Sequence, residues 1–428
     1  MIELVEFNCG SCEAPNRLQT AKLLRLSRSP RCGKCGEPLF RSLDSSLGDI
    51  APSAYQHPLD KDALEALQKI PGIRTLLRRV IRWTLELNLR LSQAANTVQV
   101  SAQQMPEIYA RFEDAAARLG ITPLPELYVV QNPFPNASTY GVEQYFVTVT
   151  TGALELLDAE EQIALFAHEL GHIHSDHMLY KTAARFISAL ASRLAAVSFG
   201  LGGLIALPLQ LGLMWWDRCA ELTADRAALL AVRRPEVVLH LLMKIAGGAP
   251  SLLEQLNFEA FLQQADRLDK MSADSGWARA LMLVQEMFRS HPFPVYRAKE
   301  IVDWVSSGNY LEILDGEYRR RSDEDSAPCA SCHKPVLKTA MVCPHCGVDP
   351  RGGTSTDDEE ASSDGPASVD DFFAEASQAA SGAVKNAGDV LKNAAGEAAS
   401  WWKKTFEAKP GATPTTEDGD EDGADDEK

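Results

Sequence analysis

The pentapeptide His168-Glu169-Leu170-Gly171-His172 constrains this chain more than any other feature. A helix turns by about 100° per residue, so His168 and His172 lie on one face and can aim two imidazoles at one metal ion. Glu169 is offset from that pair but can reach a metal-bound water, whose pKa zinc lowers to about 7. The spacing therefore predicts a helix that carries two zinc ligands and a general base.

The sequence around the pentapeptide favours a helix, although the H-E-x-x-H pattern also arises by chance on amphipathic helices. Asp158 and Glu161, three residues apart, form a capping-box pattern at its start. Because glycine costs about 1 kcal/mol inside a helix relative to alanine, we expect another backbone to pack closely on Gly171. The apolar residues that recur at helical spacing and predict a buried face are Ile163, Phe166, Ala167 and Leu170.

A catalytic zinc site needs a third protein ligand and an open position. In metzincins this ligand is a histidine six residues past the second one, but here that position is Met178. The alternative is a later helix on which Glu221 and Asp225 again lie four residues apart. Glu221 can complete the ligand set, while Asp225 can accept the N–H of a zinc-bound histidine and fix its tautomer. His177 can support the site in a similar way, whereas we expect His174 to be an exposed polar residue.

These motifs resemble those of the gluzincin metallopeptidases, the family that includes HtpX and the CAAX prenyl proteases. The resemblance covers residues 75–310 and rests on H-E-L-G-H at 168–172 and E-L-T-A-D-R at 221–226. It extends to Asn136-Ala137 ahead of a strand and to His291-Pro292 followed by Arg297. It implies that His168, His172 and Glu221 bind the catalytic zinc, that Glu169 is the general base, and that Asp225 supports a ligand.

The same resemblance implies roles outside the two motif helices. His291 would lie at the active-site wall and stabilise the oxyanion, although a histidine before a proline is commonly a turn or helix-cap residue. Asn136, Ala137 and Arg297 would contact the substrate. We expect strands at 127–130 and 145–149, and a substrate peptide could add to the nearby edge as an extra strand. A purely structural hairpin is the alternative.

Eight of the nine cysteines form C-x-x-C pairs, and two such pairs build a tetrahedral four-cysteine zinc site. We therefore predict two structural zinc ions besides the catalytic one. The N-terminus lacks the basic and apolar regions of a secretory signal, which favours zinc in a reducing, cytoplasmic compartment over disulfides. A redox role for the pairs ranks below structural zinc. The predicted ligands are Cys9, Cys12, Cys32 and Cys35 in the first ribbon, and Cys329, Cys332, Cys343 and Cys346 in the second.

Residues 194–216 carry no charge and are long enough to cross a bilayer. A single crossing would place His168 and His172 on the opposite membrane face from Glu221, so we exclude it. Gly200, Gly202, Gly203 and Pro208 are expected to interrupt a helix here. We predict a hydrophobic hairpin that lies against the membrane or covers the active site, with a re-entrant hairpin or a buried helix pair as alternatives.

Charge is distributed unevenly. From Gly352 onward the chain has 19 acidic and six basic side chains, so most of its net charge of −17 belongs to a tail. This acidic balance argues against nucleic-acid binding. Within the tail, residues 369–406 resemble a conditional amphipathic helix that orders on a protein partner or a membrane.

Residues 73–91 predict a basic amphipathic helix, which either rests on anionic lipid or is an ordinary domain helix.

Together these patterns predict a mainly α chain with a small β-sheet (α+β), built on a gluzincin-type core. The predicted function is a zinc-dependent endopeptidase that hydrolyses polypeptides with a metal-activated water. The resemblance to HtpX implies protein quality control at the inner face of the membrane. The alternative is a non-catalytic, chaperone-like or scaffold protein that binds partners through its ribbons and tail. The expected parts are a zinc ribbon (1–45), a linker (46–72), the metallopeptidase domain (73–314), a second ribbon (326–350) and a disordered acidic tail (351–428).

Overall fold

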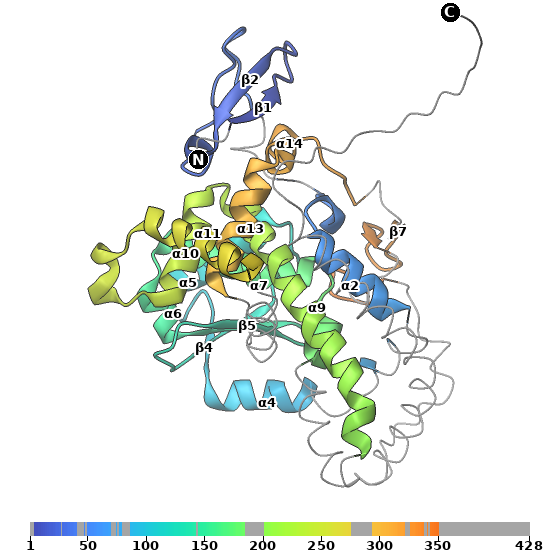
Figure 1. The fold of residues 1–428 in the computed structure, drawn as a ribbon. Coiled ribbons are helices and arrows are strands. Elements are labelled where there is room, and N and C mark those ends of the chain that lie inside the picture. The colour runs from blue at the N-terminus through green and yellow to red at the C-terminus, as the bar shows by residue number, and fades with distance from the viewer. Residues whose placement is uncertain are drawn as a thin grey trace, which may run out of the picture.

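The computed structural model describes most of the chain (Figure 1). His291, residues 194–200 and the tail from 351, including 369–406, lie outside the described residues. The structure describes residues 4–40, 47–69, 86–184, 201–274, 293–321 and 326–350, together with residues 74, 77 and 78. Within these ranges it does not describe positions 27, 48, 143, 338, 339, 341 and 342.

Helices dominate the described chain, and its strands fall into three small sheets, which confirms the predicted α+β class. The strands are β1 (Leu4–Asn8), β2 (Pro15–Gln19), β3 (Val98–Val100), β4 (Glu126–Val130), β5 (Ala137–Tyr140), β6 (Phe146–Thr150), β7 (Ser326–Pro328) and β8 (Pro335–Leu337). The helices are α1 (Thr20–Leu23), α2 (Pro58–Gln68), α4 (Glu86–Asn96), α5 (Pro106–Arg118), α6 (Thr151–Leu156), α7 (Ala159–His174), α9 (Leu201–Val232), α10 (Pro235–Gly247), α11 (Phe258–Asp274), α13 (Pro294–Ser306) and α14 (Asn309–Asp315). Short 3-10 turns lie at Pro52–Ala54 and Pro250–Gln255.

The central sheet has four strands in the order β3-β4-β6-β5. The strands predicted at 127–130 and 145–149 are β4 and β6, and they pair in parallel. The chain between them forms β5, which pairs antiparallel with β6 and lies at one end of the described sheet. β5 is therefore both one arm of a hairpin and an edge strand, and it contacts α7.

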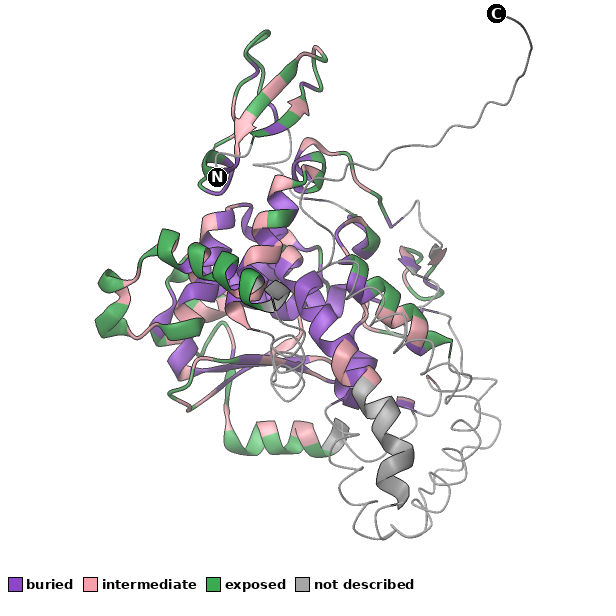
Figure 2. Ribbon diagram, in the orientation of Figure 1, coloured by how far each residue is buried: buried purple, intermediate pink, exposed green. Residues whose placement is uncertain are grey.

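Helix α7 is the buried centre of the domain (Figure 2). Its start is the predicted capping box, because Asp158 accepts from the Glu161 amide while the Glu161 carboxylate accepts from the Asp158 amide. The Glu161 carboxylate also accepts a hydrogen bond from Lys244 of α10 at 2.5 Å. Helices α5, α9 and α10 and strand β5 pack around α7, so the pentapeptide is held from several sides.

Helices α7 and α9 approach each other closely at Gly171. A Cβ built on Gly171 would lie 2.7 Å from the Ala227 Cβ and 3.4 Å from the Ala224 Cα. The expectation that another backbone packs on Gly171 is therefore confirmed. Only glycine lets α9 come this close to the pentapeptide, which brings the second motif to the first.

Helix α9 corrects the predicted hairpin over its described part. It is one continuous helix of 32 residues that runs through Pro208 and carries Glu221 and Asp225 in its second half. A proline inside a helix costs about 3 kcal/mol, but the later part of α9 is anchored by buried packing against α7 and α2. Among the described residues, none of the helices combines the length and apolar character that a bilayer crossing needs.

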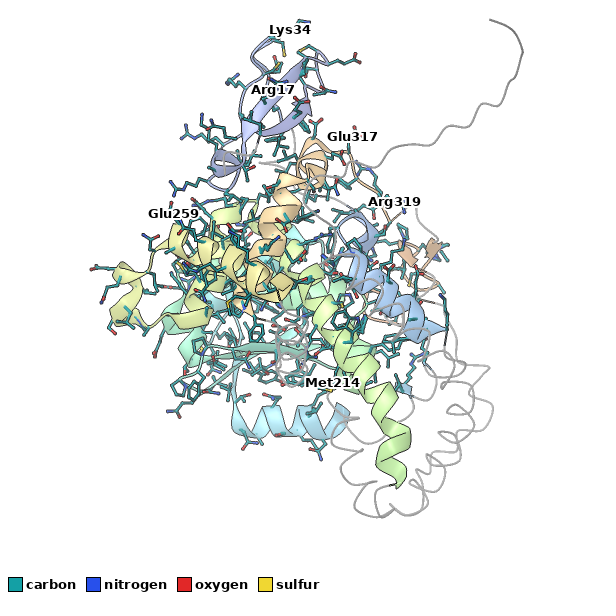
Figure 3. The ribbon with its side chains drawn as sticks, viewed as in Figure 1. Arg17, Lys34, Met214, Glu259, Glu317 and Arg319 are labelled. Atoms are coloured by element: carbon teal, nitrogen blue, oxygen red, sulfur yellow. The ribbon has the colours of Figure 1, made fainter. Side chains whose placement is uncertain are left out.

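Both cysteine-rich ribbons pack onto the domain. Ribbon 1, at the N-terminal end, contacts α13 through α1, and an ion pair joins its Arg25 to Glu259 of α11. Figure 3 places Arg17 and Lys34 on the outer part of ribbon 1, with Glu259 on the helices below it. Ribbon 2 includes β7 and β8, and its Pro344 carbonyl accepts from the Thr122 amide at 2.9 Å.

Residues 46–72, expected to be a linker, contain a helix that is integrated into the domain. α2 packs against α9, and Asp60 on α2 is fully buried. The preceding segment pairs with the connection after α14, where the Ala51 amide donates to the Arg319 carbonyl at 2.9 Å; Figure 3 labels Arg319 there, near Glu317.

Of the predicted basic helix at 73–91, the described arginines pair with protein acids. Arg74 pairs with Asp176 at 3.5 Å, and Arg78 pairs with Asp349 of ribbon 2 at 3.4 Å.

Candidate metal centre and active site

The three predicted zinc ligands meet at one buried point. One ligand atom from each of His168, His172 and Glu221 lies within 4.8 Å of the others, and all three side chains are buried. His168 Nε2 is 3.2 Å from one Glu221 oxygen, and His172 Nε2 is 3.3 Å from the other. Helices α7 and α9 thus bring together residues that are about fifty positions apart in the sequence.

This donor set fits a divalent cation such as zinc. His172 Nε2 is buried and has no hydrogen-bond partner among the described residues, so its lone pair is available to a metal. Burial and the charge of Lys181 hold the pKa of His172 well below its usual value, which keeps the ring neutral. Burial alone would lower the pKa of His168, but Asp225 and Glu221 raise it to about 9, so the carboxylates favour positive charge here. Two imidazoles and a carboxylate that leave one position open are a known catalytic zinc set.

Asp225 supports His168 from behind. The His168 Nδ1–H donates to Asp225 Oδ1 at 3.0 Å, which leaves Nε2 facing Glu221. Arg297 of α13 donates to both Asp225 oxygens, at 2.7 and 2.5 Å. Burial would raise the pKa of Asp225, but the Arg297 guanidinium holds it below its usual value. Asp225 therefore stays charged and fixes the orientation of the His168 ring.

Glu221 has a cationic partner that its sequence context did not indicate. The Lys181 ammonium donates to Glu221 Oε1 at 2.5 Å and to Asp217 Oδ1 at 3.0 Å. The Lys181 side chain is buried, and so is Glu221. The Lys181 ammonium holds one oxygen of the Glu221 carboxylate, so the carboxylate has little freedom to rotate away from His168 and His172.

Glu169 contacts the edge strand of the sheet. Thr139 Oγ1 lies 2.7 Å from Glu169 Oε2 and 3.1 Å from the main-chain oxygen of Glu169. Thr139 is in β5, two residues after Ala137, so both side chains lie on the same face of the strand. The predicted general base is thus held next to the strand on which a substrate is expected to align.

The other predicted substrate contacts occupy different positions. Ala137 is the first residue of β5, and Asn136 directly precedes it; the Asn136 main-chain N–H donates to Thr150 Oγ1 at 2.9 Å. Arg297 is buried and donates to Asp225, and its predicted contact with substrate stays a prediction.

His177 and His174, which follow the pentapeptide, are both buried. His177 lies between His172 and Asp60, at 3.2 and 3.0 Å. The expectation that His174 is exposed is wrong: its Nδ1 is 2.6 Å from the Tyr55 hydroxyl, because the segment before α2 covers this end of α7.

The two cysteine clusters have the geometry of metal sites. In ribbon 1, Cys9 and Cys35 lie 3.7 Å apart at sulfur, as do Cys12 and Cys32. The backbone N–H groups of Cys35 and Lys34 lower the pKa of Cys32 to about 6, which favours the thiolate form there. A backbone N–H would also lower the pKa of Cys35 in the same cluster, but desolvation and the neighbouring thiols raise it to about 12. In ribbon 2 the corresponding sulfur distances are 3.8 Å for Cys329 to Cys346 and 3.6 Å for Cys332 to Cys343.

Sequence reasoning missed Thr139, Lys181 and Asp60. The sequence could have indicated Thr139, because residues two apart in a strand share a face and Ala137 was already a predicted substrate contact. No helical or strand spacing links Lys181 to Glu221 or Asp60 to His177, because these pairs are 40 and 117 positions apart.

Comparison with known proteins places this site within a matched region. The model of peptidase family M48 matches residues 102–305. The plastoglobule-localized metallopeptidase 48 of the Arabidopsis thaliana chloroplast is 38% identical over 296 residues, which are 68% of this chain and 82% of that protein. A protease HtpX homolog of Polynucleobacter necessarius is 26% identical over 238 residues, 50% of this chain and 79% of that protein. No solved structure matches the chain significantly.

Proposed function

We propose a catalytic mechanism for a chain that belongs to peptidase family M48 and is a metalloprotease acting on polypeptides. His168, His172 and Glu221 hold the catalytic zinc, and Glu169 is the general base. The observation that carries this proposal is that one ligand atom from each of these three residues lies within 4.8 Å of the others. Glu169, the next residue after His168 in the chain, contacts the edge strand β5 through Thr139.

Each side chain has a defined task in peptide hydrolysis. Bound zinc supplies Lewis-acid chemistry and lowers the pKa of a coordinated water to about 7. Glu169 takes the proton of the attacking water and later delivers it to the leaving amine. Thr139 keeps the Glu169 carboxylate turned toward the site. Asp225 fixes the His168 tautomer, with Arg297 holding Asp225 in turn.

The substrate backbone aligns with β5 as an additional antiparallel or parallel strand. Support comes from the place of β5 at the end of the described sheet and from its contact with α7. Main-chain hydrogen bonds would give affinity without demanding one particular sequence. An internal segment of an unfolded polypeptide can bind in this way, so we propose endopeptidase activity.

Substitution of the base tests this mechanism. Glu169→Gln should keep zinc yet lose hydrolysis of an unfolded protein, because the amide cannot take the proton of water. Glu160→Gln, at a partly buried position in the first turn of the same helix, is the matched control and should retain activity. Cleavage by Glu169→Gln at the parent rate would overturn the mechanism and revive the alternative of a non-catalytic binding protein.

We further propose three zinc ions per chain, one catalytic and two in the four-cysteine ribbons. The three separate ligand clusters support this count. Elemental analysis should find three zinc ions in the parent and two in His172→Ala. Equal counts in the two proteins would contradict a catalytic zinc at His172.

We also propose that the protein works against a lipid surface, through the uncharged stretch 194–216. Its described part forms the start of α9, which extends away from the helices packed around α7 (Figure 1). Flotation with phosphatidylcholine vesicles should carry the parent upward, and the double substitution Leu204→Glu and Leu209→Glu should prevent this. A parent that stays below the vesicles would refute the proposal.

A further inference from the structure

We propose that Asp60 and His177 are positioning residues that hold the metal-binding imidazole of His172 in its ligand tautomer. Asp60 lies ahead of the region that matches the family model, so a segment outside that region completes the catalytic centre. The inference rests on the zinc site proposed above. It adds two residues to that site and a role for the chain before α4.

The hydrogen bonds run in one direction, each donated from the metal site toward the Asp60 carboxylate. Asp60 Oδ2 is 3.0 Å from His177 Nε2, and a carboxylate can only accept, so the proton is on that nitrogen. A singly protonated His177 ring has its acceptor on Nδ1, which lies 3.2 Å from His172 Nδ1. His172 must therefore carry its proton on Nδ1. Its Nε2 is left with a lone pair, and it faces Glu221 at 3.3 Å.

Asp60 is held rigidly enough to impose this order. It is the third residue of α2 and has no solvent exposure. Its Oδ2 also accepts from the Thr223 hydroxyl at 2.7 Å and from the Gln56 amide at 3.1 Å. Thr223 in turn accepts from the His57 amide at 3.0 Å. Because Thr223 lies on α9 between Glu221 and Asp225, the same helix carries the third ligand and anchors the carboxylate that orients the second.

The segment around Asp60 is joined to three helices of the domain. The Tyr55 hydroxyl contacts His174 of α7 at 2.6 Å, and Arg226 of α9 donates to the Tyr55 carbonyl at 3.2 Å. His57 Nε2 lies 3.1 Å from a carboxylate oxygen of Glu300 on α13. These bonds leave α2 little freedom to move away from the site. The two candidate histidine ligands thus have separate supports, Asp225 for His168 and the Asp60–His177 pair for His172.

Zinc affinity of the full-length protein tests the relay. Chelator competition gives the dissociation constant of the zinc ion that is lost in His172→Ala. Asp60→Leu removes the acceptor and should weaken zinc binding by about 10- to 100-fold, the usual effect of losing a hydrogen-bond partner of a metal ligand. Asp60→Asn keeps an acceptor oxygen and should restore most of the affinity. Asp62→Leu, at an exposed position on the same helix, should leave it unchanged.

His177→Phe provides a second, independent break in the relay, with α2 left intact. It should weaken zinc binding as much as Asp60→Leu, and the double variant should be no weaker than either single one, because both remove the same interaction. Two zinc ions retained in the ribbons and an unchanged circular dichroism spectrum identify folded protein. Unfolding in the His172→Ala background separates a loss of fold stability from a loss of zinc affinity.

The outcomes distinguish the relay from the zinc site itself. Unchanged zinc affinity in folded Asp60→Leu and His177→Phe would overturn the relay and leave the zinc site standing. Additive losses in the double variant would also overturn it. Equal zinc content in the parent and His172→Ala would refute the proposed zinc site, whatever the Asp60 variants do.

Discussion

The hydroxyl of Thr139 lies 2.7 Å from a carboxylate oxygen of Glu169 and 3.1 Å from its main-chain oxygen. This contact joins the edge strand β5 to the pentapeptide helix α7 at the residue that we propose as the base. Thr139 is almost completely buried, so water does not compete for the bond. The orientation of the Glu169 carboxylate and the position of β5, the proposed substrate-binding edge, are therefore coupled through one side chain.

Replacement of Thr139 by valine should lower kcat/KM while zinc content stays unchanged. Valine has nearly the same shape but cannot donate, and a hydrogen bond to a charged group contributes roughly 1.5–3 kcal/mol. The expected loss in kcat/KM is therefore about 10- to 100-fold. Thr139→Ser should retain most of the activity, and Thr148→Val on the adjacent strand is a control whose hydroxyl contacts Gln93 instead. A fully active Thr139→Val would show that Glu169 is oriented by other contacts.

Gly171→Ala should destabilise the protein, although alanine is the better helix former. The added Cβ would lie 2.7 Å from the Ala227 Cβ, and overpacking of this kind costs about 1–3 kcal/mol. Displacement of α9 would also move Glu221, so zinc content should fall. Gly247→Ala in α10 is the matched control, since nothing lies within 4 Å of the position that its Cβ would take. Thermal unfolding and zinc analysis measure both effects, and equal behaviour of the two variants would contradict the close approach.

Lys181→Met should lower the unfolding free energy of the zinc-free protein. The substitution leaves the buried Glu221 carboxylate without its ammonium partner, and breaking a buried pair costs about 3–5 kcal/mol. Zinc supplies a replacement cation, so its addition should stabilise the variant more than the parent. Urea unfolding with and without a chelator measures this difference. Lys61→Met, at an exposed position, should change stability little; an equally small effect of Lys181→Met would show that the pair contributes nothing.

Arg297→Lys tests whether this arginine supports Asp225 or binds substrate. Lysine cannot reproduce the two parallel bonds of the guanidinium to the Asp225 carboxylate. We expect zinc affinity to fall by about 10- to 100-fold and KM at saturating zinc to stay near the parent value. The reverse pattern, with a raised KM and normal zinc affinity, would restore the substrate-binding role that the family resemblance implied.

Local patterns were sufficient to predict the helix of the pentapeptide, its capping box and the cysteine pairs of both ribbons. Each depends on residues within a few positions of one another, where helix geometry or a tight loop decides which side chains meet. The strands β4 and β6 were predicted for the same reason, from the composition of short segments. The helix within residues 46–72 was not predicted, although Pro58 at its first position and the good helix formers that follow are local signals. The interruption expected near Pro208 was wrong, because tertiary packing outweighed local propensity there.

The sequence alone determined which residues could carry the chemistry: His168, Glu169 and His172 on one turn of helix, with Glu221 and Asp225 on another. Only the tertiary structure decided what surrounds them. Thr139, Lys181 and Asp60 reach their partners across 30, 40 and 117 positions of chain, where no helical or strand period operates. Their contacts exist because α2, β5 and α9 pack on α7, and buried polar groups in that core must find partners.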